Sequence, residues 1–265
     1  MSQDKTTYKY AIKVEYIGKN YAGSQIQPNE IVTVQSELEK ALSTLILGSR
    51  FKTKLDSDIK KERPIKTVFS GRTDKGVNSK GQVVHFEIEK TLVASKFIYS
   101  MNEILPADIS ISDLKEVKTG FHAQKSAKKR TYKYIFLNKH NKSAFDGGLL
   151  LVRGELDISR MQKALECLLG EHDFSSFKSS GATTPNTTCF IYKVGCKKLG
   201  DTVVIDIVGN RFLYNMVRAI VGTLLMIEKY DLEPEIMKNI LEAKDRSKAG
   251  KTVNPHGLTL MKVEY

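Results

Sequence analysis

Cysteine is scarce in this sequence, and its spacing argues against two common uses. The chain has three cysteines, at positions 167, 189 and 196, and none forms a Cys-x-x-Cys pair. An odd number at these spacings argues against a disulfide framework and against a zinc site. The histidines are scattered as well: His85, His122, His140, His172 and His256. We therefore expect no metal centre.

Long apolar runs are missing too. No run approaches the roughly 20 residues that a helix needs to cross a membrane. Residues 1–6 lack the hydrophobic core of a signal peptide. We therefore expect a cytoplasmic protein with no membrane partner.

Acidic residues are outnumbered by basic ones. The 265 residues include 42 Lys and Arg against 30 Asp and Glu, which gives a net charge of +12 and a pI near 9.4. This balance indicates a polyanionic partner, with nucleic acid favoured over a membrane surface. A generic basic protein has the same composition, so charge alone does not decide between the two. The length and the 41% hydrophobic content suit two modest soluble domains.

The first part of the chain alternates strand-like and helix-like patterns. We expect strands over 8–16, 65–69, 82–88 and 109–117. Thr33 is a candidate helix N-cap, and apolar residues follow it at helical spacing as far as Gly48. A second helix over 94–104 ends before Pro106. The charged stretch 52–63 has no period and is expected to be a surface insertion. The order β-α-β-β-α-β is that of a ferredoxin-like domain.

The second part repeats this order with additions. Strands are expected over 131–137, 190–198, 202–208 and 258–264, and helices after Asp157, over 213–228 and after Pro234. We place the boundary at Gly120, which gives ferredoxin-like domains over 1–119 and 120–265. The expected fold class is α+β, with mixed, mainly antiparallel sheets flanking a basic central cleft, the usual place for a site.

A single carboxylate, Asp74, stands in a glycine-punctuated loop between two expected strands. Gly71 and Gly76 allow a sharp turn that presents Asp74 rather than burying it. Arg72 and Lys75 flank it, and nearby cations lower the pKa of a carboxyl, which suits a nucleophile or a charge stabiliser. An Arg-Asp pair that merely closes a turn is the structural alternative.

The longer sequence pattern around this loop is specific. Residues 71–77 read Gly-Arg-Thr-Asp-Lys-Gly-Val, and residues 81–86 read Gly-Gln-Val-Val-His-Phe. Together they closely resemble the signature of the TruA family of tRNA pseudouridine synthases, which implies that Asp74 is the catalytic residue. Lys75 and Asn78 replace the alanine and histidine that are usual there, and Ser24 replaces a tryptophan. The first two departures bear on the choice of target uridines, and Ser24 bears on local packing.

A second motif combines cations with aromatic residues. Residues 128–134 read Lys-Lys-Arg-Thr-Tyr-Lys-Tyr, a composition that suits phosphates together with stacked bases. Two tyrosines on one face of a strand are more often core, so the pattern alone favours a structural role. The family resemblance implies instead that Tyr132 stacks on the target base, with Tyr134 left as core. Arg130, Lys129 and Lys75 are the further expected substrate-binding residues.

A third motif spans residues 211–222, where Arg218 lies within an apolar helix. An unpaired charge there is costly, so a partner is expected, and a structural salt bridge is the plain alternative. The resemblance implies that the partner is Asp74, which Arg218 and Arg72 position. Residues 170–177 and 254–258 also match family segments and are expected to be structural.

The resemblance implies an isomerase that converts uridine to pseudouridine in the tRNA anticodon stem-loop, at positions 38 to 40. The N1–C1′ bond is cleaved and the base is rejoined through C5, which is redox-neutral and implies no cofactor. Whether Asp74 adds to the sugar or removes a sugar proton stays open. The resemblance also implies a homodimer. The alternatives are a non-catalytic RNA-binding protein or chaperone on the same fold, and a basic α/β protein that acts on small anions.

Overall fold

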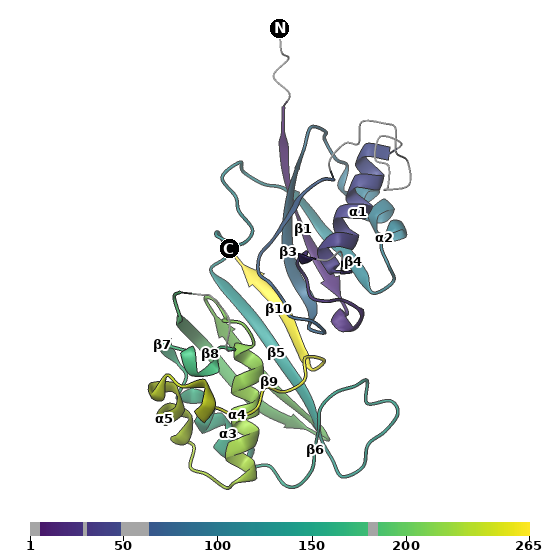
Figure 1. Ribbon diagram of the computed structural model, residues 1–265. Helices are drawn as coiled ribbons and strands as arrows, with labels where there is room; N and C mark the ends of the chain where they lie inside the picture. Colours follow the sequence, from purple (N-terminus) through teal and green to yellow (C-terminus); the bar gives the residue numbers. More distant parts are fainter. Residues whose placement is uncertain (1–5, 29–30, 49–63, 180–184) are drawn as a thin grey trace. The chain divides into compact units, whose positions relative to one another are not determined.

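The chain divides into two compact units, Met1–Ala127 and Lys128–Tyr265. In this computed structural model the described residues are 6–28, 31–48, 64–179 and 185–265 (Figure 1). The stretch 52–63, expected to be a surface insertion, lies outside the described residues.

The first unit has the ferredoxin-like order that the sequence predicts. Its elements are β1 (Tyr8–Tyr16), α1 (Val34–Leu47), β2 (Thr67–Phe69), β3 (Asn78–Ile88), α2 (Ala94–Ile104) and β4 (Ile109–Glu116). The strands pair in the order β4-β1-β3-β2, and every pair is antiparallel. Figure 1 shows α1 and α2 together on one face of this sheet. The α+β fold class is therefore confirmed for this unit.

Local sequence explains why α1 begins and ends where it does. The Thr33 hydroxyl accepts a hydrogen bond from the Ser36 N–H at 3.1 Å, and the Thr33 N–H donates to Ser36 Oγ at 2.9 Å. This capping box satisfies two backbone donors at the helix start. Gly48 follows the last turn with a positive φ of 55°. Between these ends Leu38 and Leu42 are fully buried, which seats the helix on the sheet.

Strand β3 begins earlier than its apolar pattern predicts. The sequence indicates a start at Gln82, whereas the strand runs from Asn78 and its Ser79 pairs with Tyr16 of β1. The register of this pair shifts between Val14 and Tyr16, so an irregular ladder carries the strand past Gly81. Asp74 consequently lies only a few residues before the start of β3, which pairs with both β1 and β2.

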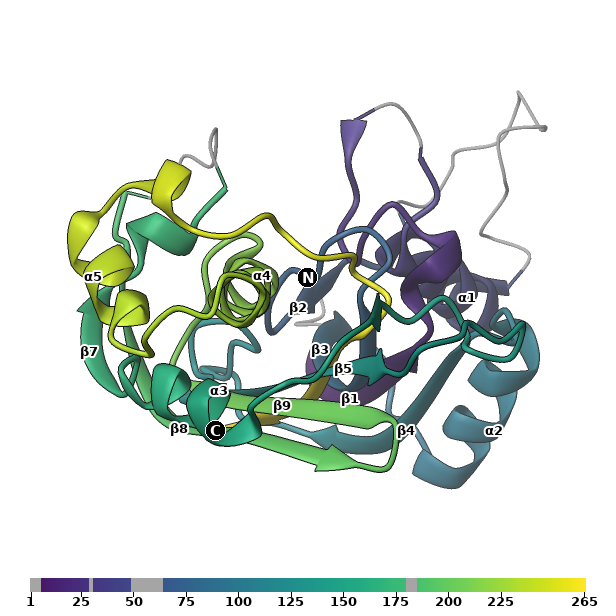
Figure 2. The ribbon, with the colours of Figure 1, turned by 90° about the horizontal axis from the view of Figure 1, so that it is seen from below.

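The second unit carries the same strand order with additions. Its elements are β5 (Lys129–Asn138), β6 (Leu151–Val152), α3 (Ile158–Glu166), β7 (Gly170–Asp173), β8 (Thr188–Leu199), β9 (Thr202–Gly209), α4 (Met216–Lys229), α5 (Ile236–Ala243) and β10 (Leu258–Glu264). The strands pair antiparallel in the order β10-β5-β9-β8-β7, and the short β6 runs parallel to β5. Figure 2 shows α3, α4 and α5 on one face of β8 and β9.

The segment 120–127 belongs with the first unit, whereas we expected it after the domain boundary. The Ala123 N–H donates to the Nδ1 atom of buried His85 at 3.1 Å. The ring of Phe121 meets the same imidazole edge-on, with centroids 6.0 Å apart. These contacts fix the start of the segment on β3, so the compact units divide at 127/128 rather than at 119/120.

Candidate active site

Asp74 lies at a tight turn in the loop between β2 and β3. Its carbonyl accepts the N–H of Val77 at 3.1 Å, and its side chain is half-buried. The positive φ expected in this loop falls on Gly76, at 79°, and not on Gly71. A left-handed residue in the turn lets the chain reverse direction directly after Asp74.

The residue before Asp74 is held by a pair of hydrogen bonds. The N–H of Ser24 donates to the carbonyl of Thr73 at 3.1 Å, and the N–H of Thr73 donates to Ser24 Oγ at 2.8 Å. Ser24 is completely buried. Where the family resemblance leads us to expect tryptophan, this chain has a small hydroxyl residue that holds the loop directly.

Side chains from the sheet fix the rest of the loop. Tyr16 Oη lies 2.8 Å from Thr73 Oγ1, and Gln82 Nε2 donates to the carbonyl of Gly71 at 2.8 Å. Burial raises the pKa of the Tyr16 hydroxyl, so the group stays protonated at neutral pH. The loop is therefore anchored to β1 and to β3 directly before the residue that we expect to be catalytic.

The loop after β1 comes very close to the turn that follows Asp74, because Gly18 has no side chain. A Cβ atom on Gly18 would lie 2.1 Å from the carbonyl oxygen of Val77. The Gly18 N–H donates to Asn78 Oδ1 at 2.9 Å. Asn78, which departs from the usual histidine of the family, thus has a structural partner in this chain. The turn after Asp74 depends on a residue without a side chain at position 18.

The flanking cations of this loop, Arg72 and Lys75, are exposed. Their side chains are accessible to solvent while the loop that carries them is fixed. Charged groups in such a position suit contacts with RNA phosphates.

The second motif lies at the start of β5. Lys129 is exposed, and its Nζ atom lies 4.8 Å from the ring centroid of Tyr192. Arg130 Nη1 donates to the carbonyl of Asn210 at 2.6 Å, and burial lowers the pKa of its guanidinium. Lys129 is thus placed over an aromatic ring, and Arg130 is tied to the loop after β9.

The two tyrosines of this motif have different surroundings. Tyr134 is fully buried, and its hydroxyl donates to the carbonyl of Asn254 at 2.9 Å, so its expected place in the core is confirmed. Tyr132 is 8% exposed, and its ring meets the ring of Phe212 edge-on with centroids 5.0 Å apart. Since Phe212 belongs to the third motif, the structure brings the second and third motifs together within this unit.

Arg218, on the first turn of α4, is held at two points. Its Nε atom donates to the carbonyl of Val253 at 2.8 Å, and its Nη1 atom donates to Asn215 Oδ1 at 2.5 Å. The side chain is half-buried. Two hydrogen bonds from different nitrogen atoms of a planar group fix both its position and its plane.

The residues that hold Arg218 in place were not predicted from the sequence. Asn215 carried a signal, because an asparagine directly before a helix is a typical N-cap, but that signal points to capping and not to an arginine contact. The Val253 carbonyl carried none, since a backbone group has no sequence signature.

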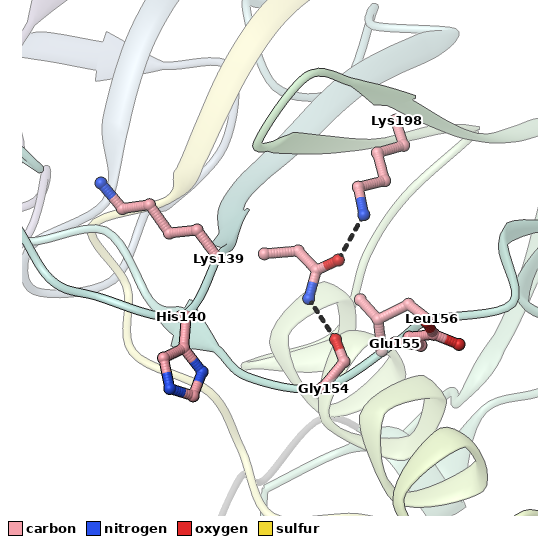
Figure 3. Close-up of a pocket in the computed structure, with 7 residues that line it drawn as sticks. Lys139, His140, Gly154, Glu155, Leu156 and Lys198 are labelled. Carbon is pink, nitrogen blue, oxygen red and sulfur yellow. Dashed lines mark hydrogen bonds between the residues drawn. The ribbon is translucent and has the colours of Figure 1, made fainter.

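One open pocket lies in the second unit, apart from the residues expected to form the site. It has a volume of about 460 Å³ and is lined by Asn138, Lys139, His140, Gly154, Glu155, Leu156 and Lys198 (Figure 3). Lys198 Nζ donates to Asn138 Oδ1 at 2.6 Å, and Lys139 Nζ donates to Asp146 at the same distance. Its lysines thus already have protein partners, and we assign no ligand to it.

Two classes of feature are absent from the described part of the chain. No group of three or more His, Cys, Asp or Glu residues there could hold a metal ion. None of its helices is long and apolar enough to cross a membrane.

Comparison with known proteins finds a family model, curated relatives and solved structures. A family model described as tRNA pseudouridine synthase matches residues 164–265. The tRNA pseudouridine synthase A of Colwellia psychrerythraea is 38% identical over 258 residues, which cover 97% of this chain and 93% of that protein. The protein of the same name from Halalkalibacterium halodurans is 40% identical over 251 residues, covering 94% of this chain and 90% of that protein. A solved chain from a Cbf5-Nop10-Gar1 complex is 11% identical, with a TM-score of 0.34 over 81% of this chain and 53% of that chain.

The relatives, together with the motifs that run from the Asp74 loop to α4, define a pseudouridine synthase, an isomerase that acts on RNA. Within that class, the chain belongs to the tRNA pseudouridine synthase A family. Membership of an enzyme family disfavours the alternatives of a non-catalytic RNA-binding protein and of a protein that acts on small anions.

Proposed function

We propose that this chain isomerises uridines at positions 38 to 40 of the tRNA anticodon stem-loop, with Asp74 as the catalytic carboxylate. The observation that carries the proposal is the fixed Asp74 turn, in which Ser24 forms hydrogen bonds with both the backbone N–H and the backbone carbonyl of the preceding residue, Thr73. A carboxylate on a rigid, half-buried loop is presented to a substrate without reorganisation. The membership of the chain in the tRNA pseudouridine synthase A family supports the reaction class.

The carboxylate of Asp74 stabilises the charge that develops during the reaction. Cleavage of the N1–C1′ bond builds positive charge on the sugar, as in glycoside hydrolysis, and a nearby carboxylate stabilises that charge. The uracil then turns and bonds to C1′ through C5, the hydrogen at C5 is lost to water as a proton, and N1 takes up a proton, so the product is an isomer of the substrate. Addition of Asp74 to the sugar and removal of a sugar proton by Asp74 both use the same carboxylate.

The other expected residues take roles that follow from their side chains. Arg218 is the cationic partner that positions Asp74. Arg72 helps to position the same carboxylate. Tyr132 stacks on the base that leaves the helix, which offsets part of the few kcal/mol that base flipping costs. Arg130, Lys129 and Lys75 contact RNA phosphates. The exposure of Lys129 and Lys75 supports this assignment.

The family resemblance leads us to propose a homodimer as the active form. Sedimentation at several protein concentrations tests this, and a monomer with full activity would contradict it.

The target positions are tested with variant tRNA transcripts. In four transcripts of one tRNA, uridine is kept at position 38 only, at 39 only, at 40 only, or at none of the three. Pseudouridine is then mapped by its chemical adduct in primer extension. The proposal predicts modification in the first three transcripts and none in the fourth. Modification of the fourth transcript at another position, with none at 38 to 40, would overturn the target assignment.

A further inference from the structure

The residue before α4 has a backbone conformation that asparagine tolerates but does not require. Asn215 has φ 62° and ψ 6°, in the left-handed region. Glycine adopts this region at the lowest cost, and asparagine is among the few other residues found there. If the backbone turn were the only requirement, glycine would serve. A further role of the asparagine side chain therefore has to be argued from its own contacts.

The side chain of Asn215 does not cap the helix. An N-cap asparagine usually has an extended backbone, and its side-chain oxygen accepts an N–H from the first turn. Asn215 makes no side-chain capping hydrogen bond. Only its backbone carbonyl serves the helix, accepting the N–H of Ala219 at 2.9 Å.

The amide of Asn215 instead links two side chains. Its Nδ2 atom donates to Ser179 Oγ at 2.6 Å, and its Oδ1 atom accepts from Arg218 Nη1 at 2.5 Å. Since the nitrogen end is engaged by Ser179, the oxygen end faces Arg218. The Ser179 N–H in turn donates to the carbonyl of Tyr214 at 3.2 Å, so this serine is itself held beside the start of α4.

Arg218 gains a defined orientation from this arrangement. Its Nε–H is bound by the Val253 carbonyl, and one Nη1–H is bound by Asn215. Two of the five guanidinium donors thus serve to aim the group. A cation that is aimed before the reaction stabilises charge without the cost of reorganising during it.

We infer that Asn215 is a positioning residue for the pseudouridine synthase reaction, whose amide, oriented by Ser179, holds the Arg218 guanidinium in its working orientation. The inference rests on the proposed role of Arg218 in the reaction. Asn215 itself touches neither substrate nor reacting atoms in this account. It acts through Arg218.

The test compares kcat and KM for tritium release from tRNA labelled at C5 of uridine. Asn215→Gly keeps the left-handed backbone and removes the amide. Loss of a hydrogen bond to a charged group predicts a fall in kcat of about ten- to a hundredfold, with KM changed less than about threefold. Asn215→Asp keeps an oxygen that accepts from Arg218 and from the Ser179 hydroxyl, so kcat is expected to stay within about threefold of the wild type. Wild-type kcat in Asn215→Gly would overturn the inference.

A double-mutant cycle separates positioning from general structural damage. In an Arg218→Lys background, Asn215→Gly should lower kcat by less than about twofold further, because the group that it aims is gone. If the two losses multiply, Asn215 acts by another route and the inference is wrong. Thermal unfolding of each variant confirms that the comparison is made between folded proteins.

Arg218→Lys and Arg218→Ala alone test the proposed function separately. If both keep the wild-type kcat, the proposed role of Arg218 fails, and the inference fails with it. If both lose activity while Asn215→Gly does not, the role of Arg218 stands and only the positioning role of Asn215 is overturned.

Discussion

Ser24 and Thr73 lie 49 positions apart in the chain and hold each other through two hydrogen bonds. Each residue donates its backbone N–H to the other, to a carbonyl in one case and to a hydroxyl in the other. Both residues are buried, so water does not compete for these groups. The loop that carries Asp74 is thereby joined to the loop that follows β1.

Ser24→Ala should lower the stability of this chain measurably. The substitution removes the oxygen that accepts from the Thr73 N–H and leaves a buried donor without its partner. We expect the free energy of unfolding to fall by about 1–3 kcal/mol, measured by urea denaturation. Ser95→Ala, at an exposed serine of α2, is the control and should change it by less than about 0.5 kcal/mol. Equal effects of the two substitutions would show that the Ser24 contact contributes nothing.

Gly18→Ala should impair catalysis by moving the turn after Asp74. The new Cβ atom would lie 2.1 Å from the Val77 carbonyl oxygen, so one of the two loops has to shift. A displacement of this kind near reacting groups predicts a fall in kcat of about a hundredfold. Gly120→Ala is the matched control, because a Cβ at Gly120 meets nothing within 4 Å. A Gly18→Ala enzyme with wild-type kcat would show that the turn geometry is not needed.

Binding of tRNA should depend steeply on salt. The net charge of +12 and the exposed cations of the Asp74 loop favour phosphate contacts. Lys75→Ala is expected to weaken binding and to reduce the slope of log affinity against log salt by about one unit. Filter binding at several salt concentrations measures the slope. Lys238→Ala, at an exposed lysine of α5 outside the expected site, should leave it unchanged. An unaltered slope in Lys75→Ala would remove Lys75 from the RNA interface.

His85 should make stability depend on pH in a defined direction. Burial, and then the charges of Lys9 and His122, lower the pKa of its imidazole, against a smaller opposing effect of Glu87. The Ala123 N–H donates to Nδ1, which can accept only when unprotonated. The unfolded chain therefore binds the proton more readily than the folded chain. The resulting stability is complete above the ordinary histidine pKa of about 6.5 and is lost as pH falls below it.

The measurement compares wild type with His85→Gln, which cannot titrate. The difference between their free energies of unfolding should be constant above pH about 7 and should shrink toward pH about 5. Because the carboxylates are common to both proteins, their titration cancels in the difference. A difference that grows as pH falls would mean that the folded protein favours the charged imidazole.

The sequence predicted the elements whose side-chain pattern is strong. Strands β1 and β10 and helix α2 have the expected bounds, because apolar alternation or helical spacing continues up to a clear stop. Strand β7 was not predicted, since Gly-Glu-His-Asp has no apolar alternation. It forms because β8 offers it a partner, with Gly170 opposite Ile191. Helix α4 begins at Met216 rather than at residue 213, because Asn215 takes a left-handed conformation.

The residues of the candidate site likewise include some that a sequence pattern predicts and some that it does not. Asp74 and Arg218 could be singled out from sequence, one as a lone carboxylate among glycines and the other as a charge within an apolar helix. The residues that hold them could not be given these roles, because Ser24 and Asn215 are ordinary polar residues whose partners are set by the folded chain. Their contribution depends on geometry that no local pattern records.

The role of Asp74 is tested most directly by tritium release. tRNA transcribed with tritium at C5 of uridine loses the label when the new bond forms at that carbon. We predict release by the wild type and a loss of at least about a thousandfold in Asp74→Asn, which keeps the shape of the side chain but not its charge. Binding of the same tRNA by the variant should be retained, since removal of a negative charge does not weaken contacts with phosphate. Release by Asp74→Asn at the wild-type rate would contradict the account.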